Sequence, residues 1–324
     1  MAVAALVAPG VRRISLPLPF ALRAVNAYLV EGSSGWTLVD AGLHTDEGER
    51  TLRAGLAEAG IGLAGVRRVF ITHVHPDHIG MAGTLAGAGA EVVMHRPEAD
   101  HARRLWARDG RLVEEAYAWF LAHGMPEAVD DEMRQAWLGM ASRVDPIGRI
   151  APVEDGEVLD LGGRALRVRW TPGHTDHHAV LVDEGEQVLF AGDHVLPAIS
   201  PNISLYPWSR DDPLGDFLGA LRAARGLPVR RVLPAHGEPF DDLAGRVDEL
   251  LEHHQRRLAA VRNLARGDGR HAYALCRDLF PVLRSAHEER FALAETLAHL
   301  RHLELRREVE RLGGTPVRWR TATA

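Results

Sequence analysis

The stretch Thr72-His73-Val74-His75-Pro76-Asp77-His78-Ile79 places four side chains that can bind a metal ion within six positions. It follows the apolar run Val66–Ile71, which is typical of a buried strand. In an extended segment the first two histidines lie on one face, because the strand repeat is two residues. The Asp-His pair after the proline can then turn toward a second position nearby. Imidazole and carboxylate are common ligands of zinc and related ions, so the stretch predicts a metal site at a strand end.

Three further residues of ligand type follow strand-like runs later in the chain. His174 comes after an alternating run and a Thr-Pro-Gly break, Asp193 after an apolar run and a glycine, and His236 after an apolar run that ends in Pro-Ala. Eighteen histidines in 324 residues make some chance clustering expected, and a histidine-rich polar loop is the alternative interpretation. The repeated position at strand ends favours a ligand role for all three.

The complete pattern resembles that of the metallo-β-lactamase-fold hydrolase superfamily, with HxHxDH, a His after Pro-Gly, an Asp after a strand and Gly, and a late His before Gly. The resemblance covers about the first 240 residues. It implies an α/β fold in which residues 1–240 form an αββα sandwich like the catalytic domain of glyoxalase II. Residues 241–324 resemble a connecting helix followed by a small winged-helix domain.

The resemblance also implies a ligand set for two divalent ions. Zinc is the expected metal, with iron and manganese as alternatives. The first ion would be held by His73, His75 and His174, the second by Asp77, His78 and His236, and Asp193 would bridge the two. A metal-bound hydroxide would be the nucleophile. Asp77 is the implied catalytic residue, because a carboxylate that touches both metal and nucleophile can orient the hydroxide and relay a proton.

A helical insertion is expected between the metal motif and His174, over residues 98–145. Val113, Tyr117 and Phe120 recur at helical spacing, and several tryptophans add aromatic mass. Such helices could cap the metal site and form an apolar wall for the substrate. The alternative is that they only thicken one face of the sandwich.

Three residues are candidates for substrate contact. Asn202 and Tyr206 lie in a proline-punctuated polar and aromatic segment directly after Asp193, and His177 lies close to His174. The preference of turns for Asn and Pro would by itself explain these residues in that segment. His177 could instead orient a metal ligand through a hydrogen bond.

Composition limits the classes of function. The formal charge of −6 argues against a surface built throughout for nucleic acid or anionic membrane, and no apolar run is long enough to span a bilayer. All 38 basic residues are arginine, which excludes lysine nucleophiles and Schiff bases. The single cysteine, Cys276, cannot form an internal disulfide. We therefore expect a cytoplasmic protein with a small-molecule substrate and no membrane partner.

The C-terminal tail differs in charge from the rest. Residues 253–324 hold fourteen arginines against eight acidic residues, which could indicate a nucleic-acid face. Because glutamates interleave with these arginines, a solvated or homodimer-forming face is the favoured interpretation. In the helix expected from Glu288 to about Leu303, three leucines, Leu293, Leu297 and Leu300, predict a single buried stripe.

These observations predict a dinuclear hydrolase of a small ester, thioester or lactone. A nuclease or RNA-processing phosphodiesterase of the same fold and a mononuclear iron persulfide dioxygenase are the alternatives. Antibiotic hydrolysis is disfavoured, because the commonest zinc lactamases carry cysteine where this chain has Asp193. Glutathione thioesters are disfavoured because the lysine-containing motif that holds glutathione is missing. His75, which is glutamate in flavodiiron relatives, is intact.

Overall fold

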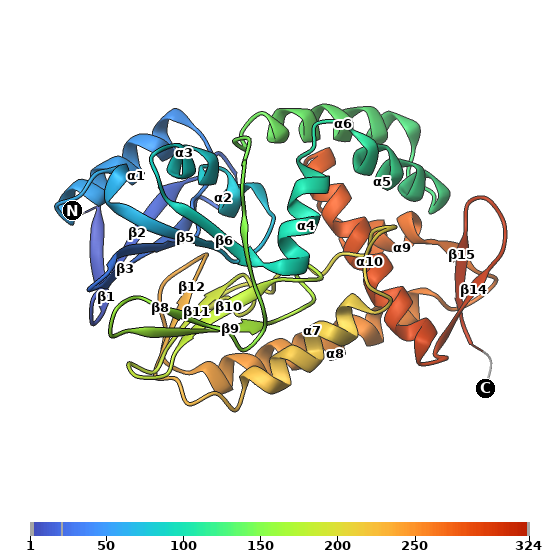
Figure 1. Cartoon of the computed structure of the whole chain (residues 1–324). Coiled ribbons are helices and arrows are strands. Elements are labelled where there is room, and N and C mark those ends of the chain that lie inside the picture. The colour runs from blue at the N-terminus through green and yellow to red at the C-terminus, as the bar shows by residue number, and fades with distance from the viewer. Residues whose placement is uncertain (1–2, 21, 323–324) are drawn as a thin grey trace.

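Two β-sheets pack face to face and helices cover the outer side of each in the computed structural model of the chain (Figure 1). The structure describes residues 3–20 and 22–322. The predicted αββα sandwich is confirmed by this layering.

The first sheet has seven strands in chain order, antiparallel up to the fourth strand and parallel from there onward. Its strands are β1 (Ala4–Ala8), β2 (Val11–Pro17), β3 (Ala24–Gly32), β4 (Gly35–Val39), β5 (Val66–Ile71), β6 (Glu91–His95) and β7 (Ala151–Val153). Its outer face is covered by α1 (Asp46–Glu58), α3 (Ala82–Gly87) and part of α4 (Arg96–Leu105), and a short 3-10 turn, Leu63–Gly65, leads into β5. The strand predicted over Val66–Ile71 is therefore confirmed.

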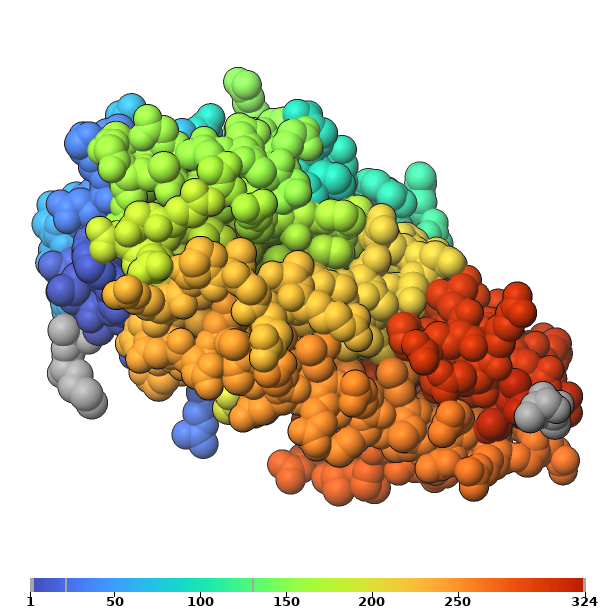
Figure 2. All heavy atoms as spheres, turned by 90° about the horizontal axis from the view of Figure 1, so that it is seen from below, coloured from blue at the N-terminus to red at the C-terminus, as the bar shows by residue number. Residues whose placement is uncertain are grey.

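The second sheet has five strands in the order β12-β11-β10-β9-β8. Its strands are β8 (Val158–Asp160), β9 (Ala165–Trp170), β10 (Ala179–Asp183), β11 (Val188–Gly192) and β12 (Arg231–Pro234). Helices α7 (Pro213–Ala224) and α8 (Leu243–Leu264) pack on its outer face. Figure 2 views this side and shows yellow to orange residues, α7 and α8 among them, meeting the red C-terminal residues at one end.

Side chains alternate along the strands between two buried layers. Val39 and Phe70 lie between the two sheets, whereas Leu38 and Ile71 lie beneath the outer helices. Burying each such side chain contributes roughly 1.5–3 kcal/mol, so a one-residue slip of register would be strongly unfavourable. The strand ends that carry the site are consequently fixed by a core on both sides.

Three helices occupy the predicted insertion. They are α4, α5 (Arg111–Ala122) and α6 (Glu127–Ala141). Trp106 at the end of α4 stacks on Trp137 of α6, with ring centroids 6.0 Å apart. Tyr117 and Phe120 of α5 are buried in the same core as the C-terminal helices. The insertion thus joins the sandwich to the C-terminal domain.

The C-terminal domain follows α8 and consists of two helices and a small three-stranded sheet. Its elements are β13 (Arg270–His271), α9 (Ala272–Leu279), α10 (Ala286–Leu305), β14 (Val309–Leu312) and β15 (Arg318–Thr321). The winged-helix assignment stays a prediction. Among the described residues, no helix has both the length and the apolar character needed to cross a bilayer.

The buried surface of helix α10 is wider than the predicted stripe of three leucines. Its three leucines are buried as predicted, but Thr296, Ala298 and His299 on its other faces are buried as well. Helix α10 packs against α6, α7, α8 and α9, and its small side chains allow these close contacts. Glu295 is nine-tenths buried and pairs with Arg257, 3.0 Å away, instead of facing solvent. The middle of α10 is therefore a core helix and is not a mixed-charge surface.

Gly173 gives a direct test of how the fold positions the site. Its φ is +131°, and a Cβ there would lie 2.3 Å from Cβ of Phe217 in α7. We expect Gly173→Ala to lower the free energy of unfolding by roughly 2–4 kcal/mol, through backbone strain and overpacking. The matched control is Gly89→Ala, where φ is +106° but no atom lies within 4 Å. Chemical denaturation measures the free energy of unfolding of both variants. Equal losses in the two would contradict this explanation.

Candidate metal centre

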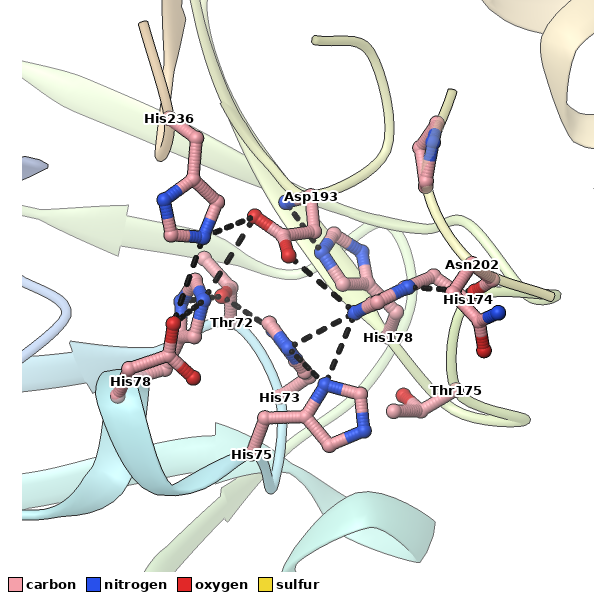
Figure 3. A network of polar contacts seen from close by, with 12 residues as sticks. Thr72, His73, His75, His78, His174, Thr175, His178, Asp193, Asn202 and His236 are labelled. Atoms are coloured by element: carbon pink, nitrogen blue, oxygen red, sulfur yellow. Dashed lines mark hydrogen bonds and ion pairs between the residues drawn. The ribbon is translucent and has the colours of Figure 1, made fainter. Parts of the chain in front are cut away.

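Loops from four strand ends meet at one edge of the sandwich. The segment after β5 carries the His-rich motif, and the loops after β9, β11 and β12 carry His174, Asp193 and His236. Pro76 occupies the first turn of the short helix α2 (Pro76–Ile79), which redirects the chain and brings Asp77 toward His236. Figure 3 shows the labelled imidazoles and Asp193 pointing toward one another from these separate segments.

The first group of donors consists of three imidazoles. Nε2 of His73 lies 3.0 Å from Nδ1 of His75, and Nε2 of His174 lies 3.2 Å and 2.9 Å from these two atoms. Ligand atoms about 2.0–2.1 Å from one tetrahedral ion lie about 3.3 Å apart, so this spacing is close to that of a zinc site. The predicted first ligand set is thus brought together.

The second group combines carboxylate and imidazole. Oδ2 of Asp77 lies 3.4 Å from Nε2 of His236 and 3.8 Å from Nε2 of His78. The residue predicted to bridge, Asp193, lies between the groups: its Oδ2 is 3.3 Å from Nε2 of His174, and its Oδ1 is 3.5 Å from Nε2 of His236. All seven predicted ligands therefore converge.

Two buried atoms at this position have no hydrogen-bond partner within the described chain. They are Nε2 of His78 and Oδ1 of Asp193, which lie 3.6 Å apart. Buried polar atoms are almost always hydrogen-bonded, and a pair left without partners calls for a ligand. A divalent ion bound by both atoms would satisfy them, so the donor set fits a metal ion at this position.

The protonation of the two groups differs. Burial, reinforced by the neighbouring imidazoles, holds the pKa of His73 and His75 well below the ordinary value, and these rings are in the neutral form that binds metal. Burial opposes protonation of His78 and His236 too, but nearby carboxylates outweigh it and raise the pKa to about 10 and about 9. Burial also disfavours ionisation of Asp77, yet these two imidazoles keep the pKa of its carboxyl below the ordinary value. The second group therefore attracts positive charge, as a metal site requires.

Hydrogen bonds made by Nδ1 of three of these imidazoles fix which ring nitrogen faces the candidate metal centre. Nδ1 of His78 donates to Asp40, 2.8 Å away, Nδ1 of His174 donates to the Asn202 carbonyl at 2.8 Å, and Nδ1 of His236 donates to a backbone carbonyl at 2.9 Å. Each bond leaves Nε2 as the ligand atom. Asp40 also accepts from the backbone N–H of Thr72 at 2.8 Å, so it holds the His78 ring and the start of the motif together.

Glu98 is a supporting residue that the sequence did not reveal. It is fully buried in the first turn of α4, and its Oε1 accepts from the Val74 amide at 2.8 Å and from the Thr175 hydroxyl at 2.9 Å. Burial raises its pKa to about 7. One carboxylate thus ties together the two loops that carry the first three imidazoles.

We expect Glu98→Ala to weaken zinc binding about 10- to 100-fold, the usual effect of losing a group that orients metal ligands. The measurement is competition for zinc with a chromogenic chelator. Glu98→Gln keeps an acceptor oxygen at Oε1 and serves as the control, with an affinity nearer that of the wild type. Equal affinity in Glu98→Ala and the wild type would contradict the supporting role.

A cavity of ≈ 780 Å³ opens directly onto the metal centre. His75, Asp77, His174, Asp193 and His236 line one end of it, and helices α4 and α6 provide much of the remaining wall. The insertion therefore does more than thicken the sandwich, because its side chains face the same space as the ligands.

The three predicted substrate contacts are placed differently. Asn202 and Tyr206 line the cavity, although the Asn202 amide donates to Glu295 of α10 at 2.9 Å. His177 is not among the lining residues, and its ring lies beside that of His95, with centroids 6.4 Å apart. His178, its neighbour, is fully buried and accepts from the Asp193 amide at 3.2 Å. Contact of Asn202 and Tyr206 with substrate stays a prediction.

Comparisons with known proteins agree with this geometry. Residues 21–236 match the family model described as "Metallo-beta-lactamase superfamily", and residues 258–323 match "Metallo-beta-lactamase-like, C-terminal domain". The Bacillus subtilis protein named "Probable metallo-hydrolase YqjP" is 26% identical over 90% of this chain and 91% of its own length.

Two solved structures are similar over nearly the whole chain. A metallo-beta-lactamase family protein of Thermus thermophilus has a TM-score of 0.88 and 39% identity, covering 97% of this chain and 99% of that one. A beta-lactamase domain protein of Burkholderia ambifaria has a TM-score of 0.86 and 30% identity, covering 98% of this chain and 94% of that one.

Proposed function

Because this chain belongs to the metallo-beta-lactamase superfamily, we propose that it is a metal-dependent hydrolase of a small ester, thioester or lactone. The observation that carries the proposal is the convergence of seven metal donors at the end of a largely apolar cavity. A cavity of this size suits a small organic substrate.

The residues that would hold the metals are those that converge. His73, His75 and His174 would bind one ion, Asp77, His78 and His236 a second, and Asp193 both. When bound, divalent ions lower the pKa of water and polarise a carbonyl oxygen. We propose zinc, and this donor set also accepts iron or manganese.

Asp77 is the residue that we propose to act on the reacting groups. Its side chain is 19% exposed and lines the cavity, whereas the other ligands of the second group are almost completely buried. Its lowered pKa keeps it ionised, so it can accept a hydrogen bond from the attacking water and pass a proton toward the leaving group. The aromatic wall from α4 and α6 would exclude bulk water from this step.

A hydrolysis screen tests the proposal. Aryl esters, thioesters, lactones and RNA are offered to the purified enzyme, at salt from about 50 to about 500 mM. We expect turnover of at least one carbonyl substrate with little response to salt. RNA cleavage that weakens steeply as salt rises, without ester or thioester turnover, would contradict the proposal and favour a phosphodiesterase.

A further inference from the structure

Two arginines line the cavity without a carboxylate partner in the described part of the chain. They are Arg143, just after α6, and Arg290 in the first half of α10. Other arginines of the C-terminal helices are paired: Arg257 lies 3.0 Å from Glu295, and Arg301 lies 2.6 Å from Glu304. A cation on a cavity wall without a carboxylate partner is available to bind an anionic group of a ligand.

Arg290 contacts a hydroxyl and two aromatic rings, none of which neutralises its charge. Its Nη1 donates to the Tyr206 hydroxyl at 2.5 Å, and its guanidinium carbon lies 4.3 Å from the ring centroid of Phe291 and 5.2 Å from that of Trp137. Its Nε and Nη2 have no acceptor among the described residues. These two donors form one edge of the planar group, the edge that binds carboxylate or phosphate with two parallel hydrogen bonds.

Part of the cavity wall is apolar. It is formed by side chains from the insertion and from α10, namely Leu105, Trp106, Met133, Trp137, Met140 and Phe291. A hydrocarbon segment is the chemistry that this wall favours, because burying apolar surface there stabilises the complex. Metal donors, apolar wall and guanidinium thus line a single cavity.

We propose that the substrate is an ester or thioester whose apolar acyl chain ends in an anionic group, and that Arg290 binds this group. This inference rests on the proposed function. Arg143 supplies a second positive charge to the same cavity. Hydrolysis joins the water oxygen to the acyl carbon and breaks the bond to the leaving oxygen or sulfur. The products are a diacid or phosphono acid and the alcohol or thiol, which takes up a proton from the attacking water. The C-terminal domain accordingly contributes a specificity residue to the site.

Matched esters test this assignment. Monophenyl glutarate carries a terminal carboxylate, and phenyl pentanoate is a neutral ester of the same length. We expect kcat/KM to be about tenfold or more higher for the anionic ester, since a charge-assisted hydrogen bond contributes roughly that factor or more. This ratio should fall by about tenfold in Arg290→Gln and less in Arg290→Lys, which keeps the charge but not the planar edge.

The matched control is Arg284→Gln, an exposed arginine just before α10 that is not among the lining residues and should keep the wild-type ratio. A ratio near one in the wild type would overturn the proposal. So would an unchanged ratio in Arg290→Gln.

Ligand binding separates failure of this inference from failure of the proposed function. Calorimetry compares 4-phenylbutyrate, 3-phenylpropylphosphonate and the neutral 4-phenylbutan-1-ol on the full chain as purified. If no ester is hydrolysed, the proposed function fails. The anion site is still supported if an anion binds more tightly than the alcohol and this preference is lost in Arg290→Gln. The stronger of the two anions identifies carboxylate or phosphonate as the group recognised. Equal binding of acid and alcohol overturns the site.

Discussion

Asp77→Asn should lower kcat by about two to four orders of magnitude while the fold and the metal content are retained. The substitution keeps the shape and one oxygen of the side chain, and six other donors still converge on the centre. It removes the negative charge that faces His236 and His78. It also removes the carboxylate oxygen that would accept a proton. Steady-state kinetics on the best substrate from the screen, with metal analysis and circular dichroism of the same sample, measure the effect.

The control for this prediction is Asp100→Asn, which removes the same charge from an exposed position of α4. It should leave kcat unchanged. Turnover of Asp77→Asn near that of the wild type, with metal bound, would exclude Asp77 from the chemical step.

Asp193→Ala is expected to lose most of the bound metal and, with it, measurable turnover. Among the described side chains, only the Asp193 carboxylate lies within 3.6 Å of imidazoles from both groups. Its Oδ2 faces His174, and its Oδ1 faces His78 and His236, so its loss would affect both ions. The buried Nε2 of His78 would also lose its nearest anion. This variant differs from Asp77→Asn, which should keep its metal, and elemental analysis separates the two.

His177→Ala provides the matched control for metal binding. It removes an imidazole three positions from His174, but one that does not line the cavity. Metal content should be that of the wild type. If Asp193→Ala retained full metal content, the position of Asp193 between the two groups would have no role in binding.

The convergence of the seven candidate ligands could be predicted because each is marked locally in the sequence. A strand-like run, a Gly or Pro break and a ligand-type residue occur together at His174, Asp193 and His236. Strand ends of a sandwich meet at one edge, so local signals were sufficient to predict a shared site. The resemblance to a known family then supplied the partition into two groups.

Features that depend on tertiary contacts could not be predicted in the same way. Glu98 supports ligands through Val74 and Thr175, which are 24 and 77 positions away in the chain. Its own sequence context is that of an ordinary helix start. The burial of α10 on several faces likewise comes from neighbouring helices, and the sequence of Arg290 does not distinguish it from the paired arginines around it.

The number and identity of the metal ions bound per chain distinguish a two-metal hydrolytic site from the alternatives. We expect two divalent ions, zinc in protein purified without added metal, measured by elemental analysis against protein concentration. Asp193→Ala should fall well below that number, and Asp77→Asn should match it. A single iron per chain, or a wild-type protein that binds no metal at micromolar concentrations, would contradict a two-metal hydrolytic site.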